Sequence, residues 1–157
     1  MKFSDLALMI MEHESRDLGN GASDSEIKVA ECSLGVQIDG GYRLFLKRFG
    51  WGGIEHLELY GLGIGVPPHL DLVRITKSER TEMEPKLPRA LIPINNDGGG
   101  NLFCLDSSVP LEPPVVFWDH TGESDQDASV EAESFVHWLA FELSPPASTL
   151  GHVEKLE

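Results

Sequence analysis

Residues that can do chemistry gather in one stretch, "NNDGGGNLFCLDSS", at positions 95–108. Its glycines, carboxylates, amides and cysteine suit four kinds of site: a metal loop, a phosphate cradle, a nucleophile or a tight turn. A phosphate loop is excluded, because that pattern requires Gly-Lys-[Ser/Thr] and the stretch holds no Lys or Arg. A dinucleotide fingerprint is also excluded, because the residues after the glycines alternate like a strand and do not open a helix.

Two interpretations of the stretch remain, a cation site and a hairpin turn. Asn95, Asp97, Asn101 and Asp106 carry the hard oxygen atoms that calcium prefers, although their spacing is not that of an EF-hand. Asn, Asp and Gly also tolerate positive φ and bond to their own backbone, as tight turns require. We favour the turn and expect neither a metal nor another cofactor.

The cysteines offer little for nucleophilic catalysis. Cys104 lies between Phe103 and Leu105 in a predicted strand, and buried cysteines are commonly inert. The chain has two cysteines, Cys32 and Cys104. They are too few for a disulfide scaffold and too far apart for a metal motif, so we expect two reduced thiols.

The sequence "WDH" places a carboxylate, Asp119, beside an imidazole, His120, which could form an acid–base pair. Neighbouring residues on a strand point to opposite faces, so the two groups converge only if the strand ends there. We interpret the pair as a strand end followed by an acidic loop. An enzyme that uses Asp119 and His120 is the weaker alternative.

Charge is distributed unevenly along the chain, whose formal net charge is −14. Between residues 90 and 154 there is no Lys or Arg. The same segment holds eleven acidic residues, namely Asp97, Asp106, Glu112, Asp119, Glu123, Asp125, Asp127, Glu131, Glu133, Glu142 and Glu154. Such a negative field repels phosphate backbones, which excludes direct nucleic-acid binding and favours either a basic partner or a role in solubility alone.

The helices that must position these residues follow from apolar spacing and capping signals. Ser23 and Glu26 form a capping box, and Gly35 stands where the same helix should end. Ser134 can cap a last helix whose residues Phe135 and Trp138 point inward. The expected helices cover about residues 4–13, 24–34, 40–49, 68–78 and 135–143.

Short apolar runs separated by turn residues predict strands in succession, and therefore an antiparallel sheet. We expect an α+β fold in a single domain, residues 1–157, with a central, mainly antiparallel sheet, helices packed on one face and a C-terminal helix. Residues 146–157 should be loosely held. Neither a membrane-spanning run nor a signal peptide is present in the sequence, which favours a cytoplasmic location. The expected strands lie within residues 52–63, 89–95, 101–106, 113–120 and 129–133.

Several segments, taken in order, resemble the SUKH superfamily, which groups bacterial immunity proteins with fungal cell-wall assembly regulators. They are "LGVQIDGGYRLFLKRFGWGGI", "ELYGLG", "LDLVRIT", "LIPINNDGGGNLFCLDSS", "PVVFWDH" and "AESFVHWL". The resemblance covers roughly residues 24–140. It departs from the family pattern at Gln37-Ile38, where Leu-Pro is usual, and it leaves out the N-terminal twenty residues.

The resemblance implies a binding protein, most simply an immunity protein that neutralises a cognate toxin, often a nuclease. A basic nuclease groove would suit an acidic surface. We therefore expect no membrane or nucleic-acid partner and a basic protein toxin. The alternative is a SUKH-type adaptor without a toxin partner. The candidate partner-binding residues are Glu123, Asp125, Asp127, Glu131 and Glu133, with Asp106 and Asp119 as expected neighbours.

Overall fold

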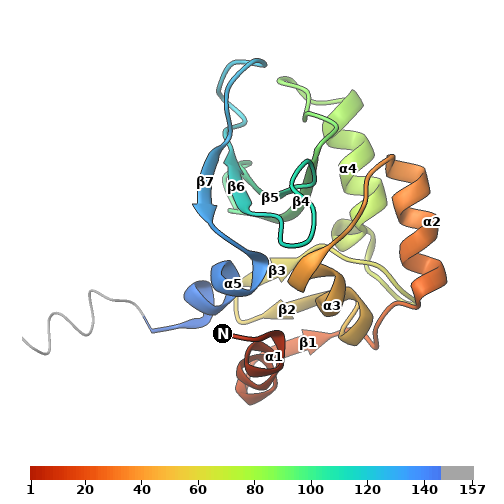
Figure 1. Ribbon diagram of the computed structural model, residues 1–157, viewed down its shortest axis with the longest axis vertical. Helices are drawn as coiled ribbons and strands as arrows, with labels where there is room; N and C mark the ends of the chain where they lie inside the picture. The colour runs from red at the N-terminus through yellow and green to blue at the C-terminus, as the bar shows by residue number, and fades with distance from the viewer. Residues whose placement is uncertain (146–157) are drawn as a thin grey trace, which may run out of the picture.

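Side-chain caps begin most of the helices of the computed structural model, which describes residues 1–145 (Figure 1). The expected capping box forms, since Ser23 Oγ accepts from Glu26 N at 3.1 Å and the Glu26 carboxylate accepts from Ser23 N at 3.0 Å. Gly35 ends that helix in the left-handed conformation. The helices of the N-terminal third are α1 (Phe3–Glu12), α2 (Asp24–Leu34) and α3 (Gly40–Arg48).

The fourth helix begins later than expected. Residues Pro68–Leu70 form a 3₁₀ turn, η1, and the α-helix α4 then covers Leu72–Thr81. Asp71 begins α4, because its carboxylate accepts hydrogen bonds from Val73 N and Arg74 N. The proline signal therefore marked the short turn and not the helix itself. The last helix, α5 (Phe135–Leu143), is capped by Ser134 as expected.

The strands form two antiparallel sheets where one was expected. The first sheet has the order β1-β2-β3, and its first strand was not predicted because it contains no β-branched or aromatic residue. The second has the order β4-β5-β6-β7 and contains the glycine-rich hairpin. The strands are β1 (Arg16–Leu18), β2 (Gly52–Ile54), β3 (Leu57–Leu59), β4 (Leu91–Asn96), β5 (Leu102–Asp106), β6 (Val115–Trp118) and β7 (Ser129–Ala132).

Two hydrogen bonds join the sheets into one α+β domain. Tyr60 N donates to Ile94 O at 3.0 Å, and the side chain of Asn95 donates from Nδ2 to Glu58 O at 2.7 Å. Asn95 is only 3% exposed, so this side-chain hydrogen bond takes the place of a hydrogen bond to water. A bulge between Pro93 and Asn95 in β4 accompanies this junction.

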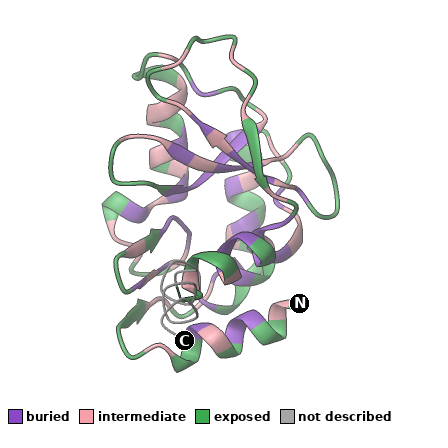
Figure 2. Cartoon of the chain, turned by 90° about the vertical axis from the view of Figure 1, so that its left-hand side faces the viewer, coloured by how far each residue is buried: buried purple, intermediate pink, exposed green. Residues whose placement is uncertain are grey.

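A shared core lies between the sheets and the helices, as the buried positions in Figure 2 show. Tyr42 and Phe45 of α3 pack against Phe135 of α5, with ring centroids 5.3 and 5.7 Å apart. The residues expected to point inward from α5, Phe135 and Trp138, are both buried, which confirms that prediction. The expectation for residues 146–157 concerns a segment outside the described part of the chain.

Candidate functional site

The glycine-rich stretch is a hairpin turn between β4 and β5, as favoured from the sequence. Asp97 Oδ1 accepts from Gly99 N at 2.8 Å and from Asn101 N at 3.1 Å, and Asp97 Oδ2 accepts from Asn101 Nδ2 at 2.9 Å. Gly98 and Gly100 supply positive φ angles of 93° and 103°. Both oxygens of this carboxylate are therefore engaged within the turn. No group of three or more His, Cys, Asp or Glu residues within residues 1–145 is arranged to hold a metal ion.

The candidate nucleophile is poorly placed for catalysis. Cys104 is fully buried in β5, and burial, followed by the charge of Glu79, raises the pKa of its thiol well above the ordinary value. A raised pKa disfavours the thiolate, which is the reactive form. The other free cysteine, Cys32, is exposed on α2.

Asp119 and His120 follow the end of β6 and take part in different turns. Asp119 Oδ1 accepts from Thr121 N at 2.9 Å and from Thr121 Oγ1 at 2.7 Å, and these bonds lower the pKa of Asp119. His120 Nδ1 lies 2.7 Å from Asn101 Oδ1, and this contact ties the loop to the β4–β5 turn. Within the described residues, neither a hydrogen bond nor an ion pair joins Asp119 to His120.

Within the acidic loop, residues 119–128, the side chain of Gln126 links Asp119 and Glu123. Its Nε2 donates to Asp119 O and Glu123 O, each at 2.9 Å, while its Oε1 accepts from Asp119 N at 3.2 Å. These hydrogen bonds involve backbone groups of Asp119 and Glu123. The carboxylates of Glu123, Asp125 and Asp127 remain exposed. No hydrogen bond or ion pair to these three carboxylates occurs in the part of the chain that the structure describes.

The structure brings together only some of the seven acidic residues predicted as a site. Glu123, Asp125 and Asp127 share the acidic loop, and β7 carries the chain on toward Glu131 and Glu133. These five residues are called the acidic face below. Asp119 adjoins the acidic face, but its carboxylate is used in a turn.

Asp106 and Asp119, both expected beside the other five acidic residues, lie apart from each other. The β5–β6 register pairs Leu102 with Trp118 and Leu105 with Val115, so Asp106 and Asp119 lie at opposite ends of this strand pair. Asp106 closes its own turn by accepting from Ser108 N and Ser108 Oγ.

Strand β7 forms the edge of its sheet and carries a bulge. Val116 pairs with Val130 and Val115 with Ala132, which leaves Glu131 as the extra residue. Figure 1 shows β7 at the margin of the molecule, and Figure 2 shows this strand largely exposed. Glu131, Glu133 and Val130 are all exposed.

Two residues of the site were missed from the sequence. Glu142 lies on α5, and its pKa is raised by partial burial and then by the charge of Glu131. The other is Gln126, which shapes the acidic loop. A glutamine among loop acids carries no sequence signal for such a bridging role, whereas the contact of Glu142 with β7 depends on tertiary packing.

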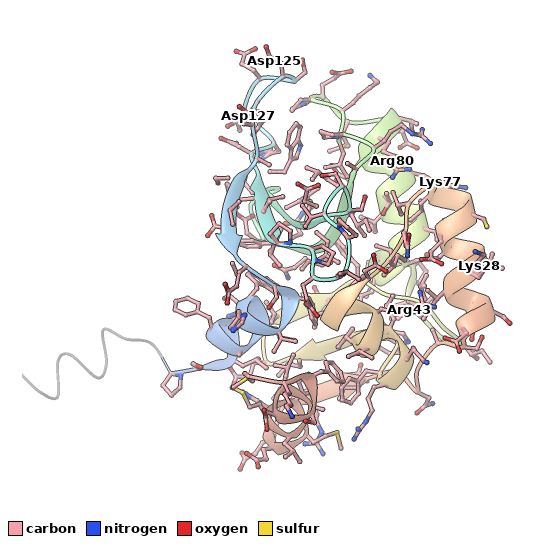
Figure 3. All side chains as sticks on the ribbon, in the orientation of Figure 1. Lys28, Arg43, Lys77, Arg80, Asp125 and Asp127 are labelled. Carbon is pink, nitrogen blue, oxygen red and sulfur yellow. The ribbon has the colours of Figure 1, made fainter. Side chains whose placement is uncertain are left out.

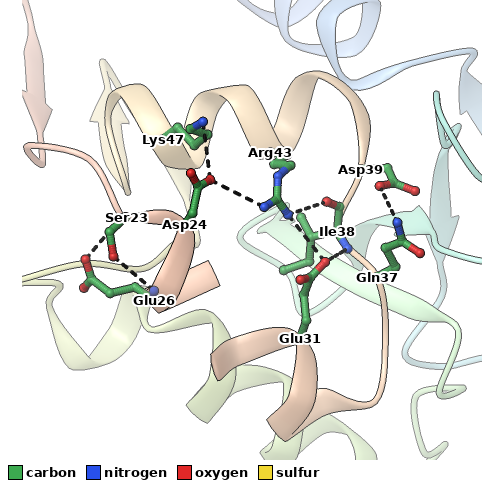
Figure 4. A network of polar contacts seen from close by, with 9 residues as sticks. All are labelled: Ser23, Asp24, Glu26, Glu31, Gln37, Ile38, Asp39, Arg43 and Lys47. Atoms are coloured by element: carbon green, nitrogen blue, oxygen red, sulfur yellow. Dashed lines mark hydrogen bonds and ion pairs between the residues drawn. The ribbon is translucent and has the colours of Figure 1, made fainter. Parts of the chain in front are cut away.

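Several cations lie away from the acidic loop. Figure 3 shows Lys28 on α2 and Lys77 and Arg80 on α4, away from Asp125 and Asp127. The N-terminal acids there have partners, as the network between α2 and α3 shows (Figure 4). Arg43 lies 3.5 Å from Glu31 and 3.6 Å from Asp24, which also meets Lys47 at 3.3 Å. Among contacts within residues 1–145, only Glu133 of the acidic face has such a contact, 3.3 Å from His137 Nδ1.

Comparison with known families gives one match that covers most of the chain. The family model described as SUKH_5, SMI1-KNR4 cell-wall, matches residues 6–143. The match includes most of α1, so it extends the resemblance beyond the expected range of 24–140. No curated protein matches the chain significantly. Among residues 1–145, no helix combines the length and the apolar character needed to cross a bilayer.

Proposed function

Because the chain belongs to the SMI1-KNR4 cell-wall family of the SUKH superfamily, we propose that it is a binding protein that neutralises a basic protein toxin. One observation carries this proposal. The acidic loop is fixed from within by Gln126, yet it presents the carboxylates of Glu123, Asp125 and Asp127 without a cationic partner among the described residues. The toxin would supply the cations, and the protein would act in the cytoplasm.

A preformed acidic loop favours rapid association with a basic surface. Nuclease grooves are basic because they hold phosphates. The segment from residue 90 to residue 154 has no Lys or Arg, so it would be attracted to the positive potential of such a groove. Such attraction mainly raises the association rate, and salt weakens it. Because the loop is already ordered by its own hydrogen bonds, less entropy is lost on binding.

The groups that could have served catalysis are used for other purposes, which supports binding over enzymatic activity. Cys104 is buried with a raised pKa, so its thiol stays protonated. The carboxylate of Asp119 holds a turn, and His120 faces Asn101. Binding by the acidic face needs none of these groups to react.

Charge reversal of the acidic loop tests the proposal. The variant Glu123→Lys, Asp125→Lys, Asp127→Lys should associate at least about tenfold more slowly, at low salt, with a toxin domain encoded by a neighbouring gene. The measurement is stopped-flow or surface binding kinetics over a series of salt concentrations. The wild-type rate should fall steeply with salt and the variant rate should not.

A matched control separates a specific surface from net charge. The variant Glu12→Lys, Glu14→Lys, Asp17→Lys makes the same change in charge at three exposed positions in α1, in β1 and in the segment between them. It should keep most of the wild-type association rate. Equal loss in both variants would reduce the effect to net charge, and no loss in either would reject the acidic face. Failure of the wild-type chain to bind the neighbouring toxin would favour the adaptor alternative.

A further inference from the structure

An apolar groove lies on the side of the molecule that carries the cations. It has a volume of about 400 Å³ and runs between α2, the segment 62–66 and the start of α4. Its apolar lining comes from Val29, Ala30, Leu62, Val66 and Val73. Val29 is 69% exposed, so part of this lining faces water.

A protruding apolar side chain stands beside the groove. Ile64 is 92% exposed, and the residues on both sides of it in the chain, Gly63 and Gly65, have positive φ angles of 116° and 84°. Ile64 also lies between Leu62 and Val66, which both line the groove. A prominent aliphatic side chain and an apolar depression therefore occur next to each other on one face.

This juxtaposition makes the face complementary to itself. In a dimer with two-fold symmetry, the same patch of both copies meets, so that residue i contacts residue j and residue j contacts residue i. When a protruding side chain and a groove lie side by side, the side chain of each copy can enter the groove of the other copy. We propose that a second copy of this chain docks here, with Ile64 of each copy in the groove of the other.

Charge favours this face over the others for self-association. Two copies that each carry a net charge of −14 repel most strongly where their acidic faces meet. The α2–α4 side instead carries Lys28, Arg74 and Lys77, none of which forms an ion pair within the described residues. The groove also includes Glu26 and Asp71.

The acidic loops stay outside such an interface, because Lys28 and Lys77 lie on the opposite side from Asp125 and Asp127 (Figure 3). The dimer does not depend on the proposed toxin binding, and it would leave the acidic face of each copy free.

Analytical ultracentrifugation of the full chain tests the dimer. We expect the wild-type protein to dimerise in a concentration series that reaches about 1 mM. Ile64→Asp should remain monomeric throughout the series. Val29→Asp, which alters the groove from an exposed position of α2, should also lose the dimer, and circular dichroism should show both variants folded.

Phe141→Asp is the matched control. Phe141 is 76% exposed on α5, so the substitution places the same charge on a comparably exposed apolar residue away from the groove. This variant should dimerise like the wild type. A monomeric wild type, or a dimer that persists in Ile64→Asp or is lost in Phe141→Asp, would overturn the proposal. A monomeric wild type whose affinity for the toxin is weakened by Ile64→Asp would also overturn the proposal. That result would mean that the groove binds the toxin and not a second copy.

Discussion

The phenol groups of Tyr42 and Tyr60, the two tyrosines of the chain, are buried and resist ionisation. Burial, followed by the charge of Glu79, raises the pKa of Tyr60 to about 12. Burial also raises the pKa of Tyr42 well above its ordinary value, and its hydroxyl donates to Tyr60 O at 2.6 Å. A charged phenolate would be poorly solvated at both positions.

These raised pKa values predict how stability depends on alkaline pH. An unfolded tyrosine ionises near pH 10, whereas folded Tyr60 holds its proton until about pH 12, so the unfolded state gains phenolate first. The stabilising contribution is therefore complete below pH 10 and declines as pH rises through 12. Tyrosinate absorbance should appear together with the loss of far-ultraviolet circular dichroism. An absorbance step near pH 10 in a protein that is still folded would contradict the prediction.

Single residues with a local role were the easiest to predict from the sequence. Ser23, Gly35 and Ser134 were assigned as caps because capping depends on neighbours within a few positions. The hairpin at Asp97 was predicted for the same reason. The turn hydrogen bonds of Asp106 and Asp119 were not predicted, because no sequence signal showed that Ser108 and Thr121 would donate to these carboxylates.

The acidic loop is an element whose shape depends on Gln126. We expect Gln126→Ala to remove three hydrogen bonds from the loop while leaving the core unchanged, since Gln126 is outside the core. The amides of Gly122 and Gln126, which donate to Asp119 O and Glu123 O, should then exchange with solvent much faster. Hydrogen exchange followed by nuclear magnetic resonance measures this change.

Gln37→Ala is a suitable control for the loop. Gln37 is exposed in a connecting segment and donates one side-chain hydrogen bond, to Asp39. Its removal should leave exchange in the acidic loop unaltered. Unchanged exchange in Gln126→Ala would mean that the loop is held by its backbone turns alone, and the preorganisation argument for rapid toxin binding would fail.

Most elements could be predicted, but their assembly into sheets could not. Apolar spacing and turn residues indicated all five helices and the strands from β2 to β7. The split into two sheets depends on which strand edges meet, and contacts such as Asn95 to Glu58 join residues far apart in the sequence. Strand β1 has only three residues and shows no alternation that a sequence pattern could detect.

On the scale of the whole molecule, Asn95 links the two sheets across a buried junction. Asn95→Ala removes the donor to Glu58 O and leaves that carbonyl without its partner, so we expect a loss of about 1–3 kcal/mol in the free energy of unfolding. Urea unfolding followed by circular dichroism and tryptophan fluorescence measures it. Trp51 borders the first sheet and Trp118 lies in the second, so the fluorescence reports on both.

The two signals should change together, because the sheets share one core. Asn20→Ala, a change at an exposed loop position, should alter the free energy by no more than about 0.5 kcal/mol. Two separate transitions in the wild-type protein would show that the sheets unfold independently. An unaffected midpoint in Asn95→Ala would show that the amide contact contributes little to the junction.

The bulge at Glu131 has a consequence for how the protein behaves when it is crowded with its own copies. An open sheet edge is a template for strand-by-strand aggregation, and fibrils grow by that route. Strand β7 is short, is interrupted after two paired residues by the bulge at Glu131, and is followed directly by Glu133. These features oppose regular strand pairing between copies at the β7 edge. The edge can therefore stay exposed and negatively charged at high protein concentration without promoting aggregation.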